Sequence, residues 1–128
     1  MKSWHLTAVL VILALLLGCG AGHPKVVSIA VSPATATAMS SSHATVAYSA
    51  TGTFDDKTSR MLSVADGLTW KSSNTAVATI DTTGVATCVA PGAATITASA
   101  PANLVISVGT GIQNTSPTVS GTATLTCD

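Results

Sequence analysis

The chain has 128 residues, which predicts one domain, because single domains commonly contain roughly 100–200 residues. Only 8% of the residues are charged and the formal net charge is zero, with no cluster of basic residues. Nucleic acid is therefore not expected as a partner, because its binding depends on concentrated positive charge. Glu is absent and aromatic residues make up 3%. After the N-terminal segment Thr, Ser, Val, Ala and Gly dominate, which favours strands over helices.

The first 18 residues have the form of a bacterial signal peptide. Lys2 and the α-amino group supply positive charge, and residues 6–17 form an apolar run that only Thr7 interrupts. As a helix this run would rise about 18 Å, whereas the hydrocarbon core of a bilayer is roughly 30 Å thick. The run is thus too short to span a membrane comfortably and has the length of a signal-peptide core.

The end of this run carries a second signal. The stretch Leu16-Leu17-Gly18-Cys19 resembles the lipobox of bacterial lipoproteins, although Leu17 is bulkier than is usual at its position. The resemblance implies that the chain is cut before Cys19, that the Cys19 sulfur is diacylated and that its new amine is acylated. The alternative is an ordinary signal peptide with an incidental cysteine.

Residues 19–25 then form a lipidated cysteine and a short flexible tether. Several acyl chains make membrane attachment effectively permanent, whereas one chain anchors a protein only marginally. In Gram-negative lipoproteins an Asp after the cysteine often signals retention in the inner membrane, but Gly20 stands there in this chain. The expected location is therefore the cell envelope, and the outer membrane in a Gram-negative cell. The sequence leaves open whether the protein faces the periplasm or the surface.

Residues 26–128 form the expected domain, whose short apolar–polar alternations are separated by turn residues. Such strands, spaced by roughly 8–12 residues, indicate a β-sandwich or barrel. Residues 34–42 read as a loop or irregular edge, residues 104–108 as a possible edge strand, and residues 109–117 as a loop. The expected strands are residues 26–31, 45–54, 60–64 (weak), 68–71, 76–80, 85–89, 93–100 and 119–127.

The alternation also predicts which side chains face the core, since successive side chains of a strand point to opposite faces. Leu68 and Trp70 share one face, so Trp70 is interpreted as a core residue; the alternative is a platform on which a sugar stacks. Other side chains expected to face inward are Val46, Tyr48, Ala50, Gly52, Phe54, Ala78, Ile80, Ala94, Ile96, Ala98, Ala123, Leu125 and Cys127.

Two cysteines remain if Cys19 is acylated. Cys88 and Cys127 form an even pair, and an oxidising compartment favours a disulfide between them. The alternative is two independent small core residues. One feature opposes the bridge: Val85, Thr87 and Val89 share a face, which points Cys88 to the other side unless a bulge intervenes.

From residue 27 onward the order of motifs is similar to the group 2 bacterial immunoglobulin-like domain, the module of intimin- and invasin-like surface proteins. The resemblance covers most of residues 26–100, with residues 120–126 as the last strand, and is weakest at residues 63–67 and 100–118. It implies an all-β fold, an immunoglobulin-like antiparallel β-sandwich of about seven strands, and a noncatalytic module. The stretches that carry it are Tyr48-Ser-Ala-Thr-Gly-Thr-Phe-Asp-Asp56, Leu68-Thr-Trp-Lys-Ser-Ser-Asn74, Gly84-Val-Ala-Thr87 and Pro91-Gly-Ala-Ala-Thr-Ile-Thr-Ala98.

No constellation of catalytic or metal-binding residues stands out. A serine nucleophile needs a base, and the His residues after the signal peptide are His23, in the tether, and His43, in a polar loop. These two lack zinc-ligand spacing with the cysteines. Asp55, Asp56 and Asp66 lack an EF-hand pattern and are read as turn-forming acids.

The expected function is therefore a lipid-anchored, noncatalytic structural or adhesive module without a cofactor. The alternative is an accessory lipoprotein that binds a glycan or a protein. Because loops carry recognition more often than strands do, residues 100–118 are the first candidate for such binding. The oligomeric state stays open.

Overall fold

The computed structural model describes residues 23–104 and 116–128. Cys19, the expected signal peptide, most of the possible edge strand at residues 104–108 and most of the 109–117 loop lie outside these residues. The described part contains no α-helix, and no helix in it is long and apolar enough to cross a membrane. Its elements are β1 (Val26–Ser32), β2 (Thr35–Ala38), β3 (Thr45–Ala47), β4 (Ser49–Phe54), β5 (Ser59–Met61), the 3₁₀ helix η1 (Val64–Asp66), β6 (Thr69–Ser72), β7 (Ala78–Ile80), β8 (Val85–Cys88), β9 (Gly92–Pro101) and β10 (Thr118–Cys127).

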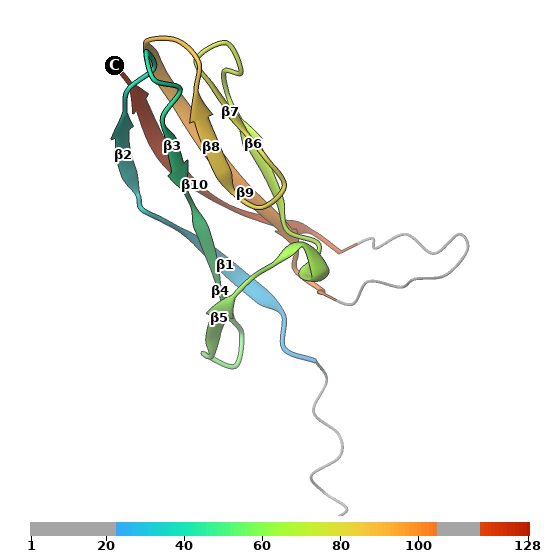
Figure 1. Cartoon of the computed structure of the whole chain (residues 1–128). Helices are drawn as coiled ribbons and strands as arrows, with labels where there is room; N and C mark the ends of the chain where they lie inside the picture. The colour runs from blue at the N-terminus through green and yellow to red at the C-terminus, as the bar shows by residue number, and fades with distance from the viewer. Residues whose placement is uncertain (1–22, 105–115) are drawn as a thin grey trace, which may run out of the picture.

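The strands form a sandwich of two layers (Figure 1). One layer is the four-stranded sheet β2-β10-β9-β6, and the other combines the sheets β1-β4-β5 and β3-β8-β7. The run β3–β4 links these two smaller sheets and is interrupted at Tyr48, whose N–H donates to the Gly84 carbonyl at 2.8 Å. All pairs are antiparallel except β2 with β10, which is parallel over Thr124–Cys127. The expectation of an all-β, immunoglobulin-like sandwich is confirmed.

The core follows the alternation of the longest strands. β9 and β10 pair over ten residues each, and every second side chain is buried from Ala94 to Ala100 in β9 and from Ala123 to Cys127 in β10. The largest side chains that are almost completely buried are Ile96, Leu125, Val26, Cys88 and Cys127. Trp70 is not among them, because its ring is half-buried and packs on the edge of the core. Trp70 thus packs against the core, as expected from the sequence, but at its edge and not fully enclosed.

Two segments differ from the sequence expectation. Residues 34–42 contain a regular edge strand, β2, which the sequence left open as a loop or edge. The weak strand expected at 60–64 ends instead at Met61, and η1 follows from Val64. Asp66 explains this ending, because its carboxylate accepts from the Ser63 N–H at 2.9 Å and caps η1 in a capping box.

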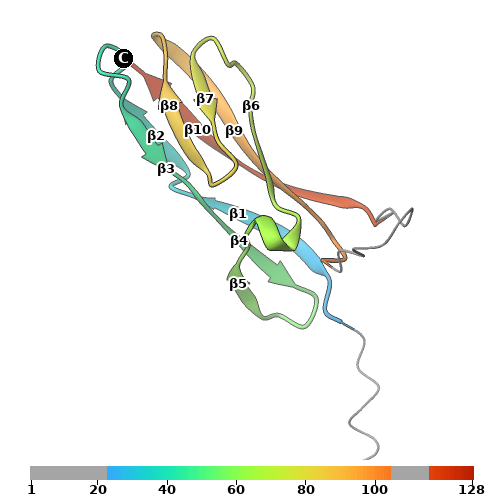
Figure 2. The ribbon, with the colours of Figure 1, turned by 45° about the vertical axis from the view of Figure 1, so that its right-hand side comes forward.

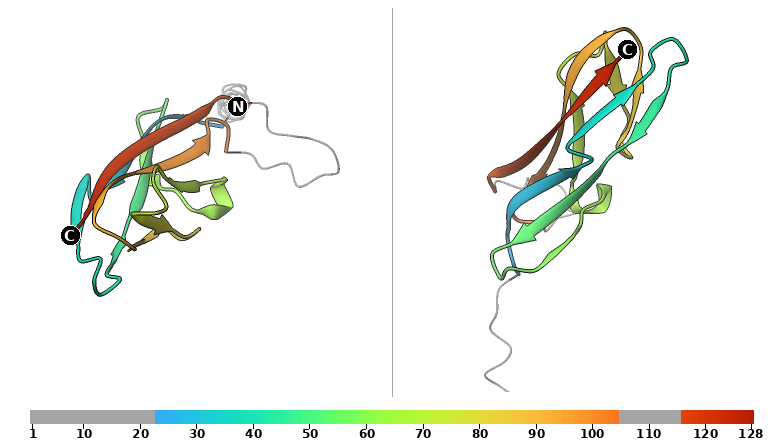
Figure 3. Two further views of the ribbon diagram at one scale, coloured as in Figure 1. Left: turned by 90° about the horizontal axis from the view of Figure 1, so that it is seen from above. Right: turned by 90° about the vertical axis from the view of Figure 1, so that its left-hand side faces the viewer.

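β1 lies directly against β10 at one glycine. An added Cβ on Gly121 would stand 2.2 Å from the backbone oxygen of Ile29, so a side chain there is incompatible with this packing. The backbone of β1 therefore crosses close to β10, and this contact joins the two layers along one edge (Figures 2 and 3).

The two ends of the sandwich have different roles. The chain enters at the lower end in Figure 1, where the Lys25 N–H donates to Asp55 at 3.1 Å and the Val26 N–H donates to the Ala102 carbonyl at 2.9 Å. β10 finishes at the opposite end, where the Ser40 N–H donates to the Asp128 carbonyl at 2.7 Å. We call these the tether end and the disulfide end.

Candidate functional site

A disulfide joins the two layers at the disulfide end. Cys88, at the end of β8, is bonded to Cys127, at the end of β10, and their Cα atoms are 5.7 Å apart. Both cysteines are at most 2% exposed. The pairing expected from the sequence is therefore present in the structure, and it links strands that are 39 residues apart in the chain.

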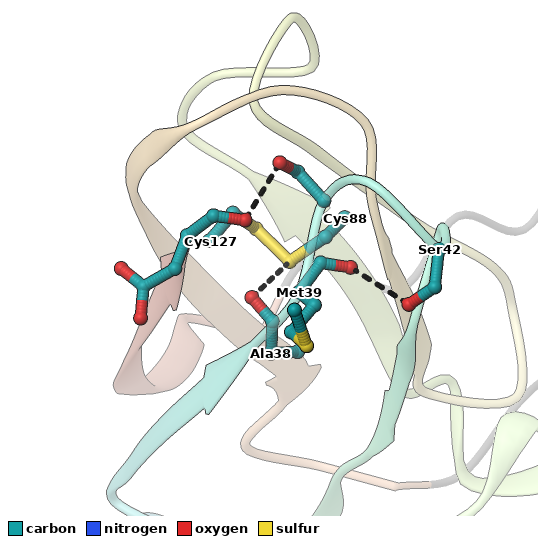
Figure 4. Close-up of a disulfide and its surroundings, with 7 residues drawn as sticks. Ala38, Met39, Ser42, Cys88 and Cys127 are labelled. Atoms are coloured by element: carbon teal, nitrogen blue, oxygen red, sulfur yellow. Dashed lines mark hydrogen bonds between the residues drawn. A yellow bond between two sulfur atoms is a disulfide. The ribbon is translucent and has the colours of Figure 1, made fainter.

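The surroundings of the disulfide tie the 39–44 turn to β10 (Figure 4). The Ser40 hydroxyl donates to the Asp128 carbonyl at 2.7 Å, and the Asp128 N–H donates to the Ala38 carbonyl at 3.0 Å. The Cys88 sulfur lies 3.8 Å from the Ala38 oxygen. This last approach is a van der Waals contact, because a disulfide sulfur carries no hydrogen to donate.

The strand that carries Cys88 buries a different face from the one that the valines suggested. Ala86 and Cys88 are fully buried, whereas Val85 is half-buried and Val89 is 43% exposed. No bulge is needed, because Thr87 pairs in regular register with both Thr45 and Thr79. The bond to Cys127 requires Cys88 to face inward, and by alternation Ala86 shares its face.

The candidate acids and His43 do not come together. His43 lies in the turn at the disulfide end, whereas Asp55 and Asp56 lie in the turn at the tether end. Asp56 accepts from the Thr58 N–H and hydroxyl, which lowers its pKa. In the described residues no group of three or more His, Cys, Asp or Glu side chains is placed to hold a metal ion.

Asp66 is the most engaged of the acids. Its carboxylate forms a bidentate ion pair with the Arg60 guanidinium, with N–O distances of 2.8 and 3.0 Å. Hydrogen bonds from Arg60 and from the Ser63 backbone lower the pKa of Asp66. Arg60 in turn lies over the ring of Phe54, 5.4 Å from its centroid.

The Arg60–Asp66 ion pair predicts how the stability of the domain changes in acid. Because the native pKa of Asp66 is lowered, its stabilisation is complete above the ordinary carboxyl pKa of about 3.9 and is lost as the pH falls through the native value. Asp66→Asn should cost about 1 kcal/mol at neutral pH, since Arg60 is half exposed, and should flatten the decline in stability below about pH 4. Urea unfolding at pH 2–7 measures the free energy of unfolding. If it falls equally steeply below about pH 4 in the variant and in the wild type, the prediction is contradicted.

Two adjoining cavities lie beside Trp70, one of about 380 Å³ and one of about 300 Å³. Residues of η1 and of the 81–84 turn in the β7–β8 hairpin contribute to their lining. We call this hollow the aromatic notch. The residues that line both cavities are Val64, Leu68, Trp70 and Thr82.

The packing of two aromatic rings shapes the notch. The Tyr48 and Trp70 rings are 6.5 Å apart at a tilt of 45°. Gly84 lies against them with φ +90°, and an added Cβ would stand 2.8 Å from the Tyr48 carbonyl oxygen and 2.9 Å from the indole. A glycine is therefore required here both for its backbone conformation and for the close approach of Trp70.

The Tyr48 hydroxyl is buried and has no hydrogen-bond partner in the described structure. Burial also raises the Tyr48 pKa. Because an unpaired buried hydroxyl costs about 1–3 kcal/mol, Tyr48→Phe should stabilise the unliganded domain by about 1 kcal/mol. Thermal unfolding measures this, and a lower unfolding temperature for the variant would contradict it.

A further hollow of about 480 Å³ lies at the tether end, between the start of the described chain and β5. Its walls include the Arg60–Asp66 pair, and also His23 and Leu104, which border the undescribed segments. The aromatic notch, by contrast, is lined by residues far in sequence from those segments. We therefore regard the notch as the better-defined candidate site.

Sequence comparison agrees with the architecture. The model of the bacterial Ig-like domain (group 2) matches residues 25–104, more than half of the chain. The chain therefore belongs to this family. No curated protein matches it. In the structure the sandwich extends past the matched residues, because β10 pairs with the full length of β9 and supplies Leu125 and Cys127 to the core.

Proposed function

We propose that the chain is a lipid-anchored protein of the bacterial cell envelope, whose Ig-like module is noncatalytic and serves structural or adhesive display. The observation that carries this proposal is the separation of the two ends. The tether joins the sandwich at one end, and the disulfide closes the other. A disulfide also supports a location outside the cytoplasm, where thiols are kept reduced.

The tether length limits how far the module stands from the membrane. Six residues separate Cys19 from Val26, and at about 3.3–3.6 Å for each step between successive Cα atoms the tether spans at most about 25 Å. An acylated Cys19 would thus keep the tether end near the bilayer and direct the disulfide end, with the 39–44 turn, away from it. Gly20 in place of Asp favours the outer membrane in a Gram-negative cell.

Cell fractionation tests the anchor. Wild-type protein should remain in the membrane fraction after a high-pH carbonate wash, because several acyl chains hold it there. Cys19→Ser should release it, or leave an uncleaved precursor, whereas Met39→Arg should fractionate as wild type, because Met39 is exposed and far from the tether. Wild-type protein in the soluble fraction would contradict the proposal.

The display role has a separate test. Cells that carry wild-type protein should adhere to a surface or to one another more than cells that secrete equal amounts of Cys19→Ser protein. Equal adherence would contradict an adhesive role and leave the second candidate, an accessory lipoprotein that binds a ligand. The aromatic notch is the observation that favours this second candidate.

A further inference from the structure

We propose that the aromatic notch binds one neutral sugar ring of a glycan, with the ring stacked on Trp70. This inference goes beyond the lipid-anchored display role and does not depend on the anchor. It rests on four properties of the notch: its charge, its aromatic wall, its hydroxyl groups and its uncovered rim.

The charge of the notch disfavours anionic ligands. No charged side chain lines the 380 Å³ cavity. Asp81 borders the smaller cavity, but its carboxylate accepts hydrogen bonds from Thr83 and from the Val85 N–H. A phosphate or an acidic sugar would find no cation there and would meet this carboxylate. The fitting ligand is therefore not an anion, and the hydroxyl groups of the walls favour a neutral one over a cation.

The walls combine an aromatic surface with hydroxyl groups. Trp70 is half-buried and borders both cavities, so part of its surface is available to a ligand. The C–H face of a sugar packs on such a surface, since the ring supplies a large apolar area with fixed geometry. Ser49, Thr82 and Thr83 add hydroxyls to the lining. An apolar pocket with a few polar groups is typical of small-ligand sites of roughly 300–1,000 Å³.

The buried Tyr48 hydroxyl is a second, independent indication. Tyr48 is 5% exposed and lines the larger cavity, yet its hydroxyl has no partner in the described structure. The hydroxyl is covered by the side chains around it, so a sugar hydroxyl that enters beside Trp70 supplies the missing hydrogen bond once these side chains shift. A purely aliphatic side chain from a partner protein cannot supply it, and this difference favours the sugar.

The rim leaves the notch open. Met61 is 64% exposed and Val64 is 58% exposed, so two apolar side chains stand at the edge of the notch without cover. The Tyr48 and Trp70 rings themselves come from the sandwich strands, at the β3–β4 junction and on β6. The backbone that carries the two rings is therefore in place before a ligand binds, which reduces the entropy lost on binding.

Trp70 is a direct reporter for the test. The full chain carries two tryptophans; a protein cleaved before Cys19 retains Trp70 alone, and Trp4→Phe gives the same single reporter in an uncleaved chain. The chain is purified from membranes in a detergent without a sugar headgroup and titrated with cellotriose, maltotriose and chitotriose, with tri-galacturonic acid as the charged comparison. At least one neutral sugar should give a saturable change in Trp70 fluorescence, with a Kd of about 1 mM or lower.

Matched variants locate the binding. Val64→Arg should weaken it at least about tenfold, because it places a long cation at the notch, whereas Met39→Arg, equally exposed but at the disulfide end, should leave it unchanged. Tyr48→Phe should weaken sugar binding while it raises the unfolding temperature of the unliganded domain. A purely structural role of the hydroxyl would not produce these two opposite effects.

Three results would overturn the proposal: no saturable change with any neutral sugar, wild-type affinity in Val64→Arg, or equal binding of the acidic sugar. A partner protein that inserts an apolar side chain would leave all the sugar titrations flat, so that outcome also counts against it.

Discussion

Replacement of both Cys88 and Cys127 by alanine is expected to lower the free energy of unfolding by about 3–4 kcal/mol. The bridge closes a loop across a sequence separation of 39 residues and so restricts the unfolded chain. The total free energy of unfolding of a native domain is about 5–15 kcal/mol, so this loss is a large share of it. At about 4–8 °C per kcal/mol, the unfolding temperature should fall by roughly 12–32 °C.

Reduction of the disulfide in the wild-type protein provides the control for this experiment. Dithiothreitol should lower the unfolding temperature of the wild-type protein towards that of the double variant and leave the variant unchanged. A double variant that unfolds within about 4 °C of the wild type, the shift expected for about 1 kcal/mol, would show that the bridge contributes little.

Gly121→Ala is expected to be the most damaging single methyl addition in the sandwich. Its Cβ would stand 2.2 Å from the Ile29 backbone oxygen, so β1 and β10 would have to separate. Overpacking of this kind costs about 1–3 kcal/mol, and we expect the upper end because the obstacle is backbone and not a movable side chain. Urea unfolding of the purified domain measures the change.

Thr122→Ala is the matched control, since Thr122 is the exposed neighbour of Gly121 on the same strand. It should change the stability by about 0.5 kcal/mol or less, as surface substitutions usually do. Equal stability of the Gly121 and Thr122 variants would mean that β1 does not cross β10 as closely as the structure shows.

The long strands could be predicted from the sequence because apolar and polar residues alternate along them with a period of two. The alternation in β9 and β10 placed Ile96 and Leu125 in the core correctly. The face of β8 was misjudged because Val85 and Val89 are the more apolar residues, whereas the disulfide requires the small Ala86 and Cys88 inside. The expected Cys88–Cys127 pairing, read together with the inward face of β10, carried the signal that would have corrected this.

The aromatic notch could not be predicted from strand periodicity. It exists because β5 stops at Met61 and the chain turns through η1, which leaves Trp70 partly uncovered. The capping by Asp66 and the left-handed Gly67 at the end of η1 produce this turn. The Ser63–Asp66 spacing was a local signal for it, but the consequence for Trp70 depends on how distant strands pack.

The most direct test of the account is mass spectrometry of the N-terminal peptide from the membrane-bound protein. Trypsin should release residues 19–25, beginning at Cys19, with a mass increased by a diacylglyceryl group and an amide-linked fatty acid. An unmodified peptide that begins at Cys19, or a peptide that still contains residues 16–18, would contradict the proposal that this Ig-like sandwich is held at the membrane by lipid.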